Sequence, residues 1–172
     1  MGSIFFFSFF YIAIIESIVS ARWYPTYFKF GIPIYSKAYP FYGTAPEPIG
    51  EVALNEALRQ NYTPALIFKE IEPNTFAFRE KMFQFRLLSY TPLMHGRLEI
   101  NPNSRTINVI GLLNWWILAF IMTFLISFSK HFEAIPFMLL VLGAIYLFQK
   151  GKYDKVGKFA FEWNSRDWSK EN

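Results

Sequence analysis

Two long apolar runs without a charged residue constrain this chain more than any other feature of its sequence. The first extends from Leu112 to Ser129 and the second from Ile135 to Phe148, and only a short polar turn separates them. A third apolar run, Ile4 to Ala21, contains a single charged residue, Glu16. A helix needs roughly 20 apolar residues to cross a bilayer, with about 17 as the lower limit. The three runs therefore predict a membrane protein.

The composition agrees with this prediction. Of the 172 residues, 53% are hydrophobic, and they include 21 Phe, 10 Tyr and 5 Trp. Aromatic rings suit lipid-facing surfaces and the headgroup region, where Trp and Tyr present one apolar and one wet side. The chain has no Cys, which excludes disulfides, thiolate metal sites and thiol catalysis.

The predicted fold class is a helical membrane protein with a small α+β domain. We expect a transmembrane helix at 1–21 with its N-terminus outside, and a cytoplasmic α+β domain with a Pro/Tyr-rich extended arm at 22–111. A transmembrane helical hairpin at 112–149 and a basic, aromatic cytoplasmic tail at 150–172 follow. A signal peptide ending at Ala21 is the alternative for the first run. The internal Glu16 and the lack of a basic residue before the run argue against it.

Basic residues near the ends of the runs set the predicted orientation. Nearly all fall on one side of the predicted membrane: Arg22, Lys29, Lys37, Arg97, Arg105, Lys150, Lys152, Lys155 and Lys158. The other side carries Lys130. Since cytoplasmic flanks are enriched in Lys and Arg, we predict a bacterial inner (plasma) membrane protein with its main domain in the cytoplasm.

Between the runs, the patterns predict one helix and several strands. Trp23 to Phe30 is expected to be an extended arm near the headgroups. An apolar period of 3.6 residues predicts a helix from about 47 to 60, and alternation predicts strands at 65–71, 75–79 and 82–88. The clearest hairpin joins 97–100 to 105–109, with Leu98 and Ile100 on the same face as Ile107 and Val109.

The tail supports two interpretations. Phe159, Phe161 and Trp163 alternate as in a strand that could add an edge to the sheet, and we favour this interpretation because Lys158 and Glu162 then point to the polar side. The alternative is an amphipathic helix on the bilayer, with Val156, Phe159 and Trp163 on one side.

Residues that carry chemistry are scarce. The chain has two histidines, and neither His95, expected in a loop beside Gly96, nor His131 has a metal-ligand spacing around it. His131, at the predicted hairpin tip, is either a solvated turn residue or a single axial ligand to a haem or chlorophyll of a larger assembly. Phosphate-binding and nucleophile motifs are absent from the sequence. We therefore expect a protein that is not an enzyme and that has no catalytic residue, metal or cofactor of its own.

Glu16 is the residue that fits its apolar surroundings least, since a carboxylate within a span is costly. Ser8, Ile12, Glu16 and Ser20 share one i,i+4 ridge of the predicted helix. This ridge is expected to face another helix, in this chain or in a partner, that supplies a donor to Glu16. In the alternative, Glu16 is protonated or reaches the headgroups and has no role.

Two sets of site residues follow from these patterns. The predicted partner-binding residues are Ser8, Glu16, Ser20, Trp115 and Trp116. The predicted lipid-headgroup residues are Arg22, Trp23, Lys150, Lys152, Lys155 and Lys158. Nucleic acid is not expected, because the basic and aromatic residues around Trp23 are typical of a membrane interface.

The predicted function is that of a non-catalytic accessory or structural subunit of a larger integral membrane complex. Its partners are other integral membrane subunits and lipid. One alternative is a stand-alone adaptor that binds anionic headgroups or a soluble partner. The other is a component of an oligomeric transporter or channel.

Overall fold

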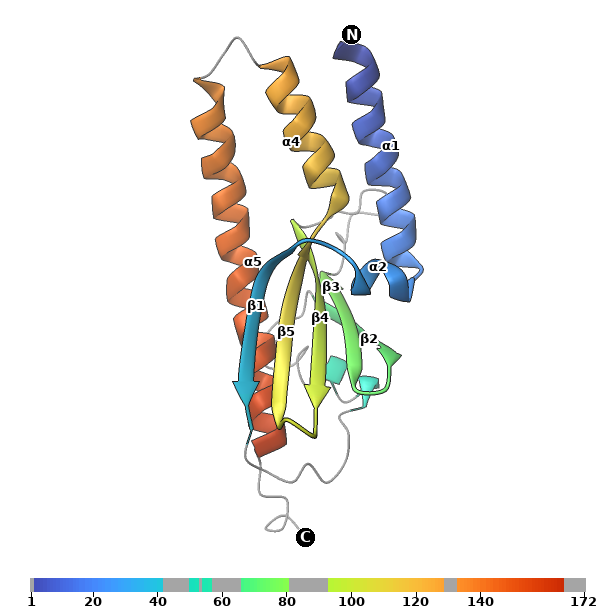
Figure 1. Cartoon of the computed structure of the whole chain (residues 1–172), viewed down its shortest axis with the longest axis vertical. Helices are drawn as coiled ribbons and strands as arrows, with labels where there is room; N and C mark the ends of the chain where they lie inside the picture. Colours follow the sequence, from blue (N-terminus) through green and yellow to red (C-terminus); the bar gives the residue numbers. More distant parts are fainter. Residues whose placement is uncertain are drawn as a thin grey trace.

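The computed structural model describes residues 2–41, 50–52, 54–56, 66–80, 93–128 and 133–165, with the backbone alone for 2–9 and 164. A five-stranded antiparallel sheet organises the fold, and helices lie against it and beyond one of its ends (Figure 1). In spatial order the strands are β1 (Pro33–Pro40), β5 (Thr106–Leu113), β4 (Met94–Asn101), β3 (Thr75–Glu80) and β2 (Leu66–Glu72).

The hairpin of β4 and β5 forms as its local sequence predicts. Leu98 pairs with Val109 and Ile100 with Ile107, and all four side chains are buried, which confirms the predicted shared face. The Asn101 carboxamide oxygen accepts hydrogen bonds from the backbone N–H groups of Asn103 and Ser104 in the turn, at 3.1 Å each. This side chain therefore helps to fix the turn.

Strand β1 is an edge strand that begins and ends with proline. Proline cannot donate a ladder hydrogen bond, so an edge is where a sheet tolerates it. The extended arm predicted for Trp23 to Phe30 is wrong, because Pro25–Lys29 forms the short helix α2. Pro25 stands in the first turn of α2, where a missing N–H costs nothing.

Helix α5 runs without interruption from Ala134 to Ser165. Its second half packs on one face of the sheet, where Tyr153, Val156 and Phe159 are buried. The predicted tail strand is therefore wrong: the residues that alternate also follow a helical period, and a helix buries them on the sheet.

Polar side chains fix α5 against two strands. Asp154 accepts hydrogen bonds from Lys37 at 2.8 Å, from Tyr35 at 3.0 Å and from Tyr39 at 3.2 Å, all on β1. Burial alone would raise the pKa of Asp154, but these hydrogen bonds outweigh it and hold the pKa below its usual range.

The Gln149 carboxamide binds a strand end of the sheet. It accepts a hydrogen bond from the Met94 N–H at 3.2 Å and donates one to the Met94 carbonyl at 3.4 Å. In this way a side-chain amide takes the place of a neighbouring strand where β4 begins.

The predicted fold class, a helical membrane protein with a transmembrane hairpin, is wrong. Among the described residues only one stretch, Ala134–Trp163 within α5, is long and apolar enough to cross a membrane, and Phe10–Ala21 and Trp115–Ser127 are shorter apolar helices. Helix α4 (Trp115–Ser127) has 13 residues, about 20 Å at 1.5 Å per residue, which is less than the hydrocarbon thickness. Its main helical neighbour is α1 (Gly2–Ala21) and not α5.

Some predicted elements are only partly described. Strands β2 and β3 confirm those predicted at 65–71 and 75–79, with small shifts of their ends. Of the predicted helix 47–60, the described residues 51, 52 and 54–56 are helical. The strand predicted at 82–88 lies outside the described residues.

Candidate functional site

The most polar buried cluster of the described chain lies where α1, α2 and α4 meet the sheet. Glu16, from α1, is 3% exposed. Its carboxylate accepts a hydrogen bond from the backbone N–H of Trp115 at 2.8 Å and one from Trp116 at 2.7 Å. These two groups belong to the first turn of α4, and the side chain of the N-cap residue Asn114 makes no capping hydrogen bond. Glu16 therefore caps α4 from another helix.

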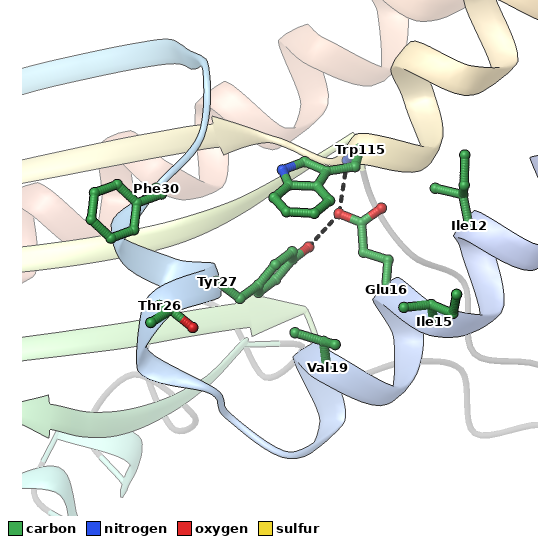
Figure 2. A pocket seen from close by; sticks show the side chains of 8 residues that line it. All are labelled: Ile12, Ile15, Glu16, Val19, Thr26, Tyr27, Phe30 and Trp115. Atoms are coloured by element: carbon green, nitrogen blue, oxygen red, sulfur yellow. Dashed lines mark hydrogen bonds between the residues drawn. The ribbon is translucent and has the colours of Figure 1, made fainter.

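A third donor to the carboxylate comes from α2. The Tyr27 hydroxyl donates to Glu16 Oε1 at 2.5 Å (Figure 2). Burial, followed by the adjacent carboxylate, raises the pKa of Tyr27 above its usual range, so the hydroxyl keeps its proton. Burial raises the pKa of Glu16 above its usual range, although the hydrogen bonds from its three donors oppose the shift.

His95 extends the cluster onto β4. Its Nε2 lies 3.1 Å from the backbone carbonyl oxygen of Tyr27, and its Nδ1 lies 2.7 Å from the amide oxygen Oδ1 of Asn114. The Tyr27 ring stacks on the imidazole with ring centroids 4.1 Å apart. Burial lowers the pKa of His95 to about 4, although its two hydrogen bonds oppose the shift. His95 is therefore neutral at pH 7.

The neutral imidazole fixes the direction of the hydrogen bonds. The Tyr27 carbonyl can only accept, so His95 Nε2 carries the proton and donates it. His95 Nδ1 must then accept. The Asn114 atom that faces it is the amide oxygen, so a hydrogen bond here requires the oxygen and nitrogen of this amide to exchange places. The Tyr27 hydroxyl donates to Glu16 and lies 3.2 Å from the same Asn114 Oδ1. We call this chain of four side chains (Glu16, Tyr27, Asn114 and His95) the junction network.

A pocket of about 450 Å³ lies beside the junction network (Figure 2). It is lined by Ile12, Ile15, Glu16, Val19, Thr26, Tyr27, Phe30 and Trp115. Most of its wall is apolar, and the Glu16 carboxylate and the Tyr27 hydroxyl are engaged with each other and with α4. The pocket therefore suits an apolar group better than a charged one.

The structure brings together three of the five predicted partner-binding residues. Glu16, Trp115 and Trp116 meet where α1 contacts α4, so the donors to Glu16 come from a helix of the same chain. Ser20 is buried on α1. Ser8 belongs to the first part of α1, residues 2–9, of which the backbone alone is described.

The predicted headgroup residues lie in two separate places. At the corner between α1 and α2, Arg22 is exposed, and Trp23 stacks on Phe28 with centroids 5.4 Å apart. Along α5, three lysines are exposed, whereas Lys152 forms an ion pair with Glu80 at 2.7 Å. The exposed lysines are Lys150, Lys155 and Lys158.

Three residues of the junction network, Tyr27, His95 and Asn114, were not predicted as site residues because their partners are distant in the chain. His95 was expected in a loop, which is wrong: it lies within β4 and is buried against α2. Asn114, directly before α4, is a residue type typical of a helix N-cap, but its side chain contacts His95 instead.

The second histidine, His131, lies outside the described residues. Within the part of the chain that the structure describes, no group of three or more His, Cys, Asp or Glu side chains is placed to hold a metal ion. Comparisons with protein-family models, with curated proteins and with solved structures found no significant match.

Proposed function

We propose that the protein is a non-catalytic accessory subunit of a larger membrane protein complex. In this proposal it contacts lipid and integral membrane partners through its helical end, which consists of α1, α4 and residues 134–148 of α5. These three segments extend together beyond one end of the sheet (Figure 1).

The observation that carries the proposal is the exposure of large apolar side chains along the helical end. The most exposed are Tyr11, Ile14, Ile15, Trp115, Met122, Phe137, Leu139, Leu140, Leu147 and Phe148. A soluble monomer rarely leaves an apolar surface of this kind in water, and such surfaces mark contacts with proteins or membranes.

Helix α5 supports membrane attachment specifically. Its apolar stretch is long enough to cross a bilayer, and little of it is buried within the described chain, unlike the core helix of a soluble protein. We propose that residues 134–148 enter the bilayer and that the sheet stays on the cytoplasmic side. The exposed Lys150, Lys155 and Lys158 follow this segment, as expected for a cytoplasmic flank.

The pocket beside the junction network supports a protein partner. It offers an apolar hollow next to exposed side chains of α1, and aromatic or aliphatic anchors that fill such hollows contribute much of the affinity of protein interfaces. We propose that an apolar side chain of a neighbouring membrane subunit occupies it.

The proposal is tested by isolating the protein from its own membranes in a gentle detergent, followed by native mass spectrometry. We expect stable co-purifying subunits and resistance to carbonate extraction. A monomer with bound anionic lipid would instead support the adaptor, and a symmetric homo-oligomer the channel component. Release by carbonate would overturn membrane attachment.

Two neighbouring isoleucines provide a matched test of the pocket. Ile15 lines the pocket and is 58% exposed, whereas Ile14 is 55% exposed and is not among the lining residues. Ile15→Asn should reduce the co-purifying subunits at least tenfold, and Ile14→Asn should reduce them much less. Equal losses in both variants would exclude the pocket as the partner contact.

A further inference from the structure

Strand β2 ends the sheet, so one of its edges lacks a neighbouring strand within the described chain. Backbone groups alternate between the two edges of a strand, and those of Ile67 and Lys69 point toward β3. The groups of Phe68 and Glu70 point away from the sheet. Such an edge is a template for pairing with another strand.

Two side chains from the helical residues 51, 52 and 54–56 bind this outer edge. The Asn55 carboxamide accepts a hydrogen bond from the Phe68 N–H at 2.8 Å and donates one to the Phe68 carbonyl at 2.9 Å. The Glu51 carboxylate accepts one from the Glu70 N–H at 3.1 Å. The pair of bonds at Phe68 is the pair that an opposite residue of an antiparallel strand would exchange with it.

The binding side chains are held in place by their own segment. The Asn55 amide nitrogen also donates to the Glu51 carbonyl at 2.9 Å, one helical turn earlier. Leu54 is fully buried in the core and anchors the segment. A side-chain amide also takes the place of a strand at Met94, where the Gln149 amide binds the backbone N–H and carbonyl groups.

We propose that Asn55 and Glu51 close the β2 edge against strand addition, and that the strand they exclude is β2 of a second copy of this chain. Antiparallel pairing centred on Phe68 places each Phe68 opposite its copy. It also places Ile67 of one copy opposite Lys69 of the other, and Leu66 of one copy opposite Glu70 of the other. No like charges face each other, and the contact is self-complementary, as a two-fold interface requires.

The absence of cysteine allows a direct test of this register. Ile67 and Lys69 point away from the core face, so single cysteines can replace them. Two variants, Ile67→Cys and Lys69→Cys, are prepared in detergent with Asn55→Ala and Glu51→Ala added to each. On mixing and mild oxidation we expect a disulfide-linked dimer, because positions 67 and 69 face each other across the two-fold axis. Each variant alone, and the mixture with Asn55 and Glu51 intact, should give at least tenfold less dimer.

A second measurement does not depend on the cysteines. Amide hydrogen exchange at Phe68 and Glu70 should become fast in the Asn55→Ala, Glu51→Ala protein when dilute, and slow again as its concentration rises. Lys69, paired with β3, should stay protected throughout. If the double substitution prevents folding, Asn55→Ala alone should show the same change at Phe68. A folded variant without concentration-dependent protection and without dimer would overturn the proposal.

Discussion

At the scale of single residues, the junction network connects elements that are far apart in the chain. Its side chains come from α1, α2, β4 and the residue before α4, and each satisfies a partner that is itself buried. Removing one member leaves its partners without their hydrogen bonds, which costs about 1–3 kcal/mol for each buried group. The network therefore fixes how the helical end joins the sheet.

The neutral His95 makes stability depend on pH. Burial holds its pKa at about 4, below the 6.5 of an unfolded chain. Between these pH values the unfolded chain binds a proton that the folded chain does not. The free energy of unfolding should therefore fall as the pH drops from about 6.5 to about 4, by about 3 kcal/mol from this residue.

Titration of the histidine ring protons by NMR checks this prediction. The chain has two histidines, so His131→Gln leaves a single imidazole signal and serves as the control. A His95 pKa within one unit of 6.5 would contradict the burial and the neutral state described above.

At the scale of elements, the start of α4 depends on a carboxylate from α1. Glu16→Gln should destabilise the fold by about 1–3 kcal/mol, because the amide nitrogen of Gln is a donor and would face the N–H and O–H donors that now bind the carboxylate. Hydrogen exchange at the Trp115 and Trp116 amides should become faster. Tyr27→Phe is the comparison: it removes one donor but keeps the cap, so these two amides should stay protected.

Two glycines of α5 test how closely the helix approaches the sheet. A Cβ at Gly157 would lie 2.1 Å from the Tyr39 ring, whereas one at Gly151 would meet nothing within 4 Å. Gly157→Ala should lower the free energy of unfolding by about 1–3 kcal/mol, because Tyr39 must move away from Asp154. Gly151→Ala should raise it by about 0.4–1 kcal/mol. Urea denaturation measures both, and equal effects would contradict the close packing at Gly157.

Elements set by local sequence were predictable, and those set by distant contacts were not. The turn after Asn101 and the alternation on both sides of it fix the β4–β5 hairpin within a few residues. Phe159 and Trp163 fit either a strand or a helix, and the choice depends on burial against strands that are far away in the sequence. Glu16 was recognised by its conflict with an apolar run, but Tyr27 and His95, 68 residues apart, gave no such sign.

At the scale of the whole molecule, apolar composition was a poor guide to fold class. The run from Leu112 to Ser129 was interpreted as one span, yet its first residues complete β5 and only 13 form α4. The run from Ile135 continues into a helix whose later residues cover the sheet. Hydropathy measures how apolar a segment is, but it cannot tell burial in a sheet from exposure to lipid.

The proposed orientation can be tested with single cysteines, because the natural chain has none. Lys155→Cys and Lys69→Cys should react with a membrane-impermeant maleimide only after the cells are permeabilised, since α5 contains the proposed anchor and packs its second half on the sheet. Both positions are exposed, so access by the reagent is not limiting. Labelling of either cysteine in intact cells would place the sheet outside the cytoplasm.

The unbroken helix α5 also connects the helical end directly to the sheet. Its 32 residues span about 48 Å as a single rod, apolar at one end and tied to β1 through Asp154 at the other. A displacement of its apolar end would therefore reach β1 through one continuous helix.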